Sequence, residues 1–306
     1  MIKQQEITIW KFDAWILASR PKTLPAAVMP VLVGSAIAIH DNKYKPLAAI
    51  VALICSLLIQ IGTNLVNDLY DYLKGTDKKE RLGPQRAAAS GLLSIKELKV
   101  GIYIVFGFSF LLGIYLIALA GWLVLLIGVL SIIAGVVYTA GPFPLAYNAL
   151  GDIASFLFFG FIGTIGTYYV QAYEITAFVF WASIPVGSLI TNILVVNNYR
   201  DKDEDKLNGK KTLAVLFGEN FVRIQYIIFM IASYSILFVV YFTFKKSIWV
   251  FLPILSLPIS LKLIRMIYTL KGKELNKTLE LTAKLSAIYG LLFAIGILIW
   301  LLKKHH

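Results

Sequence analysis

The chain carries two short segments in which carboxylates and carboxamides recur at helical spacing. The first occupies residues 64–86 and reads NLVNDLYDYLKGTDKKERLGPQR. Four of its polar residues are spaced i, i+3, i+4 and i+7, which places them on one face of an otherwise apolar helix. They are Asn64, Asn67, Asp68 and Asp71, and Asp77 follows shortly after them.

The second segment repeats this arrangement at residues 197–212, where Asn197, Asp201 and Asp205 are spaced i, i+4 and i+8. Carboxylates at the end of an apolar helix cost a few kcal/mol each to desolvate, and like charges on one face repel one another. A cation must compensate them, and oxygen ligands of this kind suit Mg²⁺ completed by phosphate oxygens. We predict that the two segments hold Mg²⁺ and clamp a diphosphate between them.

Basic side chains near the two segments are expected to neutralise the remaining phosphate charge, and arginine is suited to bidentate contact. These candidates are Arg81, Arg86, Lys210, Lys211 and Lys22. Other charges in the same loops are interpreted as ordinary solvated surface groups, namely Lys78, Lys79, Asp203 and Glu204.

An ion-coupled transporter is the alternative from a different class, because such proteins also place acids within membrane helices. Transport sites usually lie near the middle of the bilayer. In this chain the acids lie where apolar runs give way to basic loops, and this position favours an enzyme working at the membrane surface.

The elements that must position these residues are membrane helices. Hydrophobic residues make up 58% of the 306 residues, charged residues 15%, and the mean hydropathy is +0.77. This composition is far from that of a soluble domain. Apolar runs of the length that crosses a bilayer predict nine spans in one domain, residues 1–306. The spans are expected near residues 23–40, 47–70, 98–118, 121–140, 152–171, 177–199, 222–243, 247–268 and 280–302.

Most of the 29 lysines and arginines fall in the loops on one side of this map. Basic residues accumulate in cytoplasmic loops, so we expect the amino terminus and both acidic segments to face the cytoplasm of a cell membrane. Residues 1–22 are interpreted as an interfacial segment. The net charge of +12 is then explained by orientation and anionic lipid, without nucleic acid. One cysteine, Cys55, and one internal histidine, His40, offer no thiolate or imidazole cluster for a metal.

At the two acidic segments the sequence resembles the UbiA superfamily of membrane prenyltransferases, whose members carry aspartate-rich motifs on the second and sixth of nine transmembrane helices. Both motifs are present here on the second and sixth predicted spans. Many members place an acid eight residues after the first Asn. Here that position is Gly75 and the acid is Asp77, as in the naphthoquinone branch of the family. Further similar stretches lie at residues 20–34, 81–91, 138–152 and 275–284.

The resemblance implies an all-α bundle around a central cavity and transfer of a polyprenyl chain from its diphosphate to an aromatic acid. For the naphthoquinone branch the acceptor is 1,4-dihydroxy-2-naphthoate, with loss of CO₂ and diphosphate; hydroxybenzoate, homogentisate and haem acceptors remain alternatives. The prenyl tail is expected in a groove open to lipid, lined by residues such as Phe156, Phe158, Phe159 and Phe161.

Residue type, position and the resemblance together give the roles expected of individual residues. The expected Mg²⁺ ligands are Asn67, Asp71, Asp77, Asn197, Asp201 and Asp205. The expected catalytic residues are Asp71, Asp201, Asp205 and Tyr138. The expected substrate-binding residues are Asn64, Asp68, Arg81, Arg86, Lys22, Lys210, Lys211 and Asp152.

Overall fold

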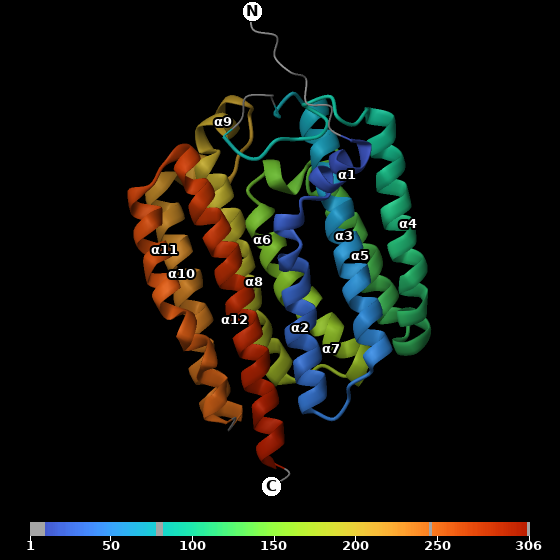
Figure 1. Cartoon of the computed structure of the whole chain (residues 1–306), viewed down its shortest axis with the longest axis vertical. Coiled ribbons are helices and arrows are strands. Elements are labelled where there is room, and N and C mark those ends of the chain that lie inside the picture. The colour runs from blue at the N-terminus through green and yellow to red at the C-terminus, as the bar shows by residue number, and fades with distance from the viewer. Residues whose placement is uncertain (1–9, 78–81, 245–246, 305–306) are drawn as a thin grey trace, which may run out of the picture.

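A computed structural model shows an all-helical bundle and describes residues 10–77, 82–244 and 247–304 (Figure 1). The helices are α1 Lys11–Ser19, α2 Pro25–His40, α3 Pro46–Leu73, α4 Ile95–Ala120, α5 Trp122–Val137, α6 Gly151–Ser155, α7 Thr164–Ala172, α8 Ala177–Arg200, α9 Lys202–Leu207, α10 Leu213–Phe244, α11 Leu257–Thr269 and α12 Leu275–Lys304. Short segments of tighter or wider helix lie between them: η1 Pro21–Thr23, η2 Leu145–Tyr147, η3 Phe156–Gly163, η4 Ile248–Ser256 and η5 Gly272–Glu274.

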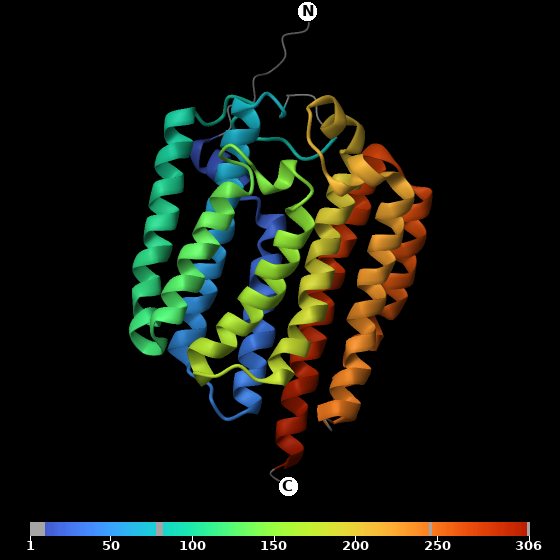
Figure 2. The same cartoon turned by 180° about the vertical axis from the view of Figure 1, so that it is seen from behind.

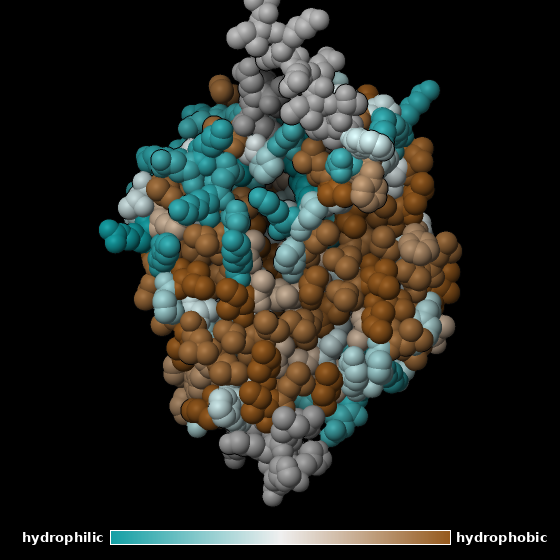
Figure 3. All heavy atoms as spheres, in the orientation of Figure 1, coloured by the Kyte–Doolittle hydropathy of each residue, from teal (hydrophilic) through white to brown (hydrophobic). Residues whose placement is uncertain are grey.

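The helices are long and apolar enough to make this a multi-pass membrane protein. Among the described residues, seven helices could cross a membrane by length and composition, and the pair formed by α1–η1 and α2, bent by 51°, raises the number to eight. The 16-residue helix α5 is apolar but shorter. Each of the nine predicted spans falls on a helical segment. A broad apolar surface covers the waist of the molecule, and polar side chains gather at the end where α9 lies (Figure 3).

Local sequence signals start several of these helices. Ser94 caps α4 by accepting a hydrogen bond from the Glu97 backbone amide at 3.2 Å, and the Glu97 carboxylate accepts one from the Ser94 amide at 2.7 Å. This reciprocal pair satisfies two amides that the first helical turn would leave unpaired. Pro46 stands at the first position of α3, where proline costs no hydrogen bond.

Two groups of helices meet along the middle of the bundle. Helix α8 packs against α10 and α12, and helix α3 packs against α4. Helix α2 joins the two groups, because it contacts both α12 and α3, and it also packs against α7 (Figures 1 and 2). Glycines permit the closest approach between η3 and α8. A methyl group added at Gly160 would lie 2.9 Å from the Gly187 Cα, so neither position accepts a side chain without separating the helices.

The segment α6–η3–α7 is one continuous helix, Gly151–Ala172, that forms one wall of the interior. Its central part, η3, has π-helical geometry over eight residues. Wide turns of this kind are frequent at functional sites because they shift the side chains that follow. Here they direct Phe158 and Phe159 into the interior of the bundle, whereas Phe156 and Phe161 do not line it.

Candidate active site

A cavity of about 440 Å³ runs through the middle of the bundle. At the end where α9 lies, its walls carry the polar residues of both acidic segments. Deeper in, its walls are mostly apolar, with single hydroxyl and amide side chains such as Ser56, Gln60 and Ser131, and they come mainly from α3, α4, α5, η3 and α7. All six residues expected to hold Mg²⁺ line this one cavity: Asn67, Asp71, Asp77, Asn197, Asp201 and Asp205.

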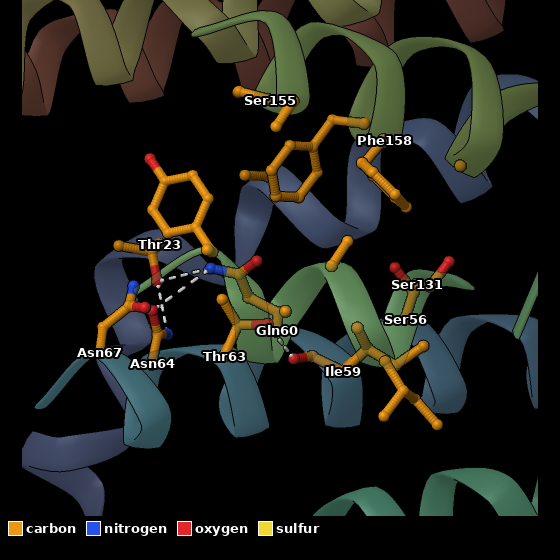
Figure 4. Close-up of a pocket in the computed structure, with 18 of the residues that line it drawn as sticks. Thr23, Ser56, Ile59, Gln60, Thr63, Asn64, Asn67, Ser131, Ser155 and Phe158 are labelled. Atoms are coloured by element: carbon orange, nitrogen blue, oxygen red, sulfur yellow. Dashed lines mark hydrogen bonds between the residues drawn. The ribbon is translucent and has the colours of Figure 1, made fainter. Parts of the chain in front are cut away.

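The first segment forms the last turns of α3 and the loop after it. The Asp71 carboxylate accepts a hydrogen bond from the Tyr147 hydroxyl at 2.7 Å and is 5% exposed. Asn67 accepts a hydrogen bond from the Thr139 hydroxyl. One helical turn deeper, the Asn64 amide donates to Thr23 Oγ1 at 3.0 Å, and Figure 4 shows both side chains at the cavity wall.

Two further acids of the first segment, Asp68 and Asp77, hold the loop that follows α3. Asp77 accepts from the Arg86 guanidinium at 2.9 Å, and both side chains line the cavity. Asp68 faces elsewhere: its carboxylate accepts from the backbone amides of Ala87 and Ala88 at 3.0 and 3.2 Å. Asp68 therefore anchors the loop on which Arg86 stands.

The second segment is organised by a buried arginine. Arg200, 3% exposed, donates to both oxygens of the Asp201 carboxylate at 2.7 and 2.6 Å. The same guanidinium donates to Asn197 Oδ1 at 2.9 Å and to Asn276 Oδ1 at 2.8 Å. Asn276 in turn donates to the Leu82 carbonyl at 2.9 Å, which connects α12 to the loop of the first segment.

Lys210 brings the two acidic segments together. Its Nζ lies 3.7 Å from an oxygen of Asp71 and 3.6 Å from an oxygen of Asp205. The separation of these two carboxylate oxygens, one from Asp71 and one from Asp205, therefore cannot exceed the sum of the two distances. Burial raises the pKa of the Asp205 carboxyl to about 7, with the Lys210 ammonium acting in the opposite direction.

A comparison with known proteins identifies the family. The model of the UbiA prenyltransferase family matches residues 27–289. The chain belongs to the UbiA prenyltransferase family.

Curated relatives and solved structures agree with this assignment. The chain is 36% identical to 1,4-dihydroxy-2-naphthoate octaprenyltransferase of Escherichia coli (strain K12), over 97% of this chain and 98% of that protein. It is 31% identical to the enzyme of the same name from Bacillus subtilis (strain 168), over 92% and 91%. Its fold is similar to that of a UbiA homolog from Archaeoglobus fulgidus bound to DMAPP and Mg²⁺, with a TM-score of 0.66 and 16% identity, over 92% of this chain and 99% of that one.

Other predicted site residues of this UbiA protein lie outside the cavity. The Lys22 side chain is 83% exposed and its Nζ lies 3.9 Å from Glu280. The Lys211 side chain is exposed, and its backbone amide donates to the Tyr147 carbonyl at 3.0 Å. Arg81 falls outside the described residues. Arg86 and Lys210 are the predicted phosphate-binding residues that do line the cavity.

Asp152 and Tyr138 mark a small side chamber next to the main cavity. Asp152 is 5% exposed and accepts from the amides of Asn198 and Gln225 at 3.1 and 2.8 Å. Tyr138 and Asn198 line both the chamber and the main cavity. Asp152 therefore does not line the main cavity itself. Its connection to the cavity is the Asn198 side chain, which contacts Asp152 and lines the cavity.

Three residues at the site were not among those predicted from the sequence. Tyr147 contacts Asp71, Arg200 holds Asp201, and Arg20 lines the cavity with its backbone in the left-handed region at φ 52°. The position of Arg200, directly before Asp201, was a usable signal. Tyr147 and Arg20 lie within the stretches 138–152 and 20–34 that carry the family resemblance, but neither has a spacing that relates it to the acids.

The chemical type of the six expected ligands, four carboxylates and two carboxamides, fits a hard cation in this UbiA protein, because all six line one cavity. Glu204, interpreted from the sequence as a surface group, also lines this cavity. Within the ranges that the structure covers, however, no three acidic, histidine or cysteine residues stand in an arrangement ready to hold a metal. Each of the four carboxylates has a basic partner: Lys210 for Asp71 and Asp205, Arg86 for Asp77, and Arg200 for Asp201. These cations provide the compensation that the buried acids require.

Proposed function

We propose that this chain is a 1,4-dihydroxy-2-naphthoate polyprenyltransferase of menaquinone biosynthesis. The observation that carries the proposal is one cavity with two acidic segments at its mouth and an apolar interior. A polyprenyl diphosphate matches this cavity, because its anionic head suits the polar mouth and its apolar tail suits the interior. The name shared by relatives that are 31–36% identical over nearly the full length supports the choice of acceptor.

We propose that Asn67, Asp71, Asp77, Asn197, Asp201 and Asp205 would hold Mg²⁺, as their ligand type and shared cavity suggest. When bound, Mg²⁺ would withdraw charge from the diphosphate and make it a better leaving group. A similar fold bound to DMAPP and Mg²⁺ in a UbiA homolog from Archaeoglobus fulgidus supports this assignment.

The basic side chains at the cavity mouth would then act on the departing diphosphate. Lys210 and Arg86 carry fixed positive charge beside the carboxylates, so they stabilise the charge that grows on the leaving group as the allylic C–O bond breaks. Arg86 can make bidentate contact with phosphate oxygens. Neither residue has to form a covalent bond with the substrate.

The apolar part of the cavity would bind the prenyl chain and exclude water from the allylic cation. Phe158 and Phe159 from η3 contribute to this wall, together with residues of α4 and α5. The ring carbon of the acceptor that bears the carboxylate attacks the allylic cation. The carboxylate then leaves this carbon as CO₂. The new C–C bond thus replaces both the C–O bond of the donor and the C–C bond to the carboxylate.

We further propose that nine helical segments cross the cell membrane, with the acidic segments on the cytoplasmic side. The short helix α5 and the bent pair α1–α2 would complete the nine. The excess of lysine and arginine in the loops at the cavity mouth supports this orientation.

The decisive experiment is an assay of the purified protein in detergent with Mg²⁺, a polyprenyl diphosphate and a panel of aromatic acids, measuring prenylated product and CO₂. We expect demethylmenaquinol and CO₂ from 1,4-dihydroxy-2-naphthoate. Prenylation of hydroxybenzoate or homogentisate alone would transfer the proposal to another acceptor. No prenylated product from any acceptor would overturn it.

A further inference from the structure

Tyr147 lies where the two acidic segments and the loop before α6 meet. It is the last residue of η2, in the connection between α5 and α6. Its hydroxyl donates to Asp71 Oδ1 at 2.7 Å and lies 2.9 Å from Thr76 Oγ1. The Thr76 hydroxyl also donates to the backbone carbonyl of Asp71 at 3.0 Å, so Tyr147 contacts the end of α3 at two points.

The ring of Tyr147 contacts a lysine from each segment. Lys74 Nζ lies 4.2 Å from the ring centroid, and Lys210 Nζ lies 4.8 Å from it. Cations near an aromatic face at these distances are attracted to the ring. The Tyr147 carbonyl accepts from the Lys211 amide at 3.0 Å, which ties the second segment to the same residue through its backbone.

These contacts fix the direction of the Asp71 carboxylate. The contacts from Tyr147 and Lys210 are both made to Oδ1. Oδ2 takes part in neither contact, and the Asp71 side chain lines the cavity that a cation would enter. Hydrogen-bond partners behind a metal ligand hold its orientation, and their removal typically costs about 10–100-fold in metal affinity or activity.

We propose that Tyr147 is a positioning residue for Asp71: its hydroxyl orients the carboxylate toward a divalent cation, and its ring holds Lys74 and Lys210 against the two acidic segments. The inference rests on the proposed function only in that Asp71 is taken as a ligand of the cation. It assigns Tyr147 no contact with the substrate.

The test is the binding of Mn²⁺ to the purified protein in the presence of inorganic diphosphate, followed by electron paramagnetic resonance. Tyr147→Phe keeps the ring and removes only the hydroxyl, so we expect about 10–100-fold weaker Mn²⁺ binding with an unchanged unfolding temperature. Tyr147→Leu also removes the ring and should weaken binding further. Tyr234→Phe on α10 is the matched control, because it removes a partly buried hydroxyl that lies 2.8 Å from Ser256 Oγ, and it should leave Mn²⁺ binding unchanged.

The outcomes separate this inference from the proposed function. Wild-type affinity in Tyr147→Phe overturns the positioning role and leaves the proposed function intact. A lower unfolding temperature with wild-type affinity assigns Tyr147 to stability alone and also overturns it. If the wild-type protein binds no Mn²⁺, both the metal assignment and the role of Tyr147 fail.

Discussion

The two acidic segments differ in how their carboxylates are held. In the first segment, Asp71 depends on Tyr147, which is 76 residues away, and on Lys210 from the second segment. In the second segment, Asp201 is held by Arg200, its neighbour in the chain, through two short hydrogen bonds. The first segment is therefore assembled by tertiary structure, whereas the second is largely organised within one helix end.

This difference has a functional meaning for the proposed enzyme, which would bind a cation and a diphosphate. Asp201 is locked by a bidentate pair that is almost fully buried, with exposed fractions of 1% and 8% for the two side chains. The Asp71–Lys210 contact is longer, at 3.7 Å, and Lys210 is shared with Asp205. We infer that Lys210 moves more readily than Arg200 when a ligand enters, because its contacts with Asp71 and Asp205 are longer than the contact between Arg200 and Asp201.

The largest expected effect is on turnover, from removal of either central carboxylate. Asp71→Ala and Asp201→Ala should each remove charge stabilisation of several kcal/mol, which corresponds to a loss of about tenfold for each 1.4 kcal/mol. Product formation in the detergent assay should fall below detection while expression persists. Full activity in either variant would remove that residue from the proposed metal site.

The next largest effect tests the buried pair. Arg200→Met leaves Asp201 buried without its partner and should destabilise the protein by about 3–5 kcal/mol, measured by unfolding in detergent. The double variant Arg200→Met/Asp201→Leu should recover most of this stability but no activity. Lys210→Met is the comparison, because it removes the cation beside Asp71 of the first segment, and it should cost less because its contacts are longer. Equal costs for Arg200→Met and Lys210→Met would remove the distinction between the two segments.

A smaller effect is expected where the first segment holds its loop. Asp68→Ala leaves the buried amides of Ala87 and Ala88 unpaired, at about 1–3 kcal/mol for each amide. Asp68→Asn keeps one acceptor oxygen and should lose about half as much. Unfolding curves of the two variants check the order, and an Asp68→Asn variant as unstable as Asp68→Ala would argue for a role of the charge itself.

The smallest effect concerns the link between the segments through α12. Asn276→Ala removes one hydrogen bond from Arg200 and one to the Leu82 carbonyl, and should cost about 1–2 kcal/mol. We expect a modest decrease in unfolding temperature and only a few-fold change in turnover. A loss of activity as large as that of Asp201→Ala would instead place Asn276 in direct contact with substrate.

Much of the fold could be predicted from the sequence because its signals are local. Apolar runs and capping residues set where the helices lie, and all nine predicted spans fall on helical segments. The roles of single charged residues were less accessible. Asp68 shares the polar stripe with Asp71, yet it serves the loop after α3. Three residues rotate by about 300° around a helix, so the two side chains point about 60° apart and can meet different neighbours.

The sequence by itself determined that this is a helical membrane protein with two acidic helix ends of matching pattern, since hydropathy and 3.6-residue periodicity are properties of each segment alone. Only the tertiary structure decided that all six expected Mg²⁺ ligands line one cavity and that Lys210 stands between the segments. It also decided that Tyr147 donates to Asp71, whereas Lys22 and Lys211 lie outside the cavity. Such convergence depends on how α3, α8 and the loop before α6 pack together, and no spacing along one helix encodes the distance to another.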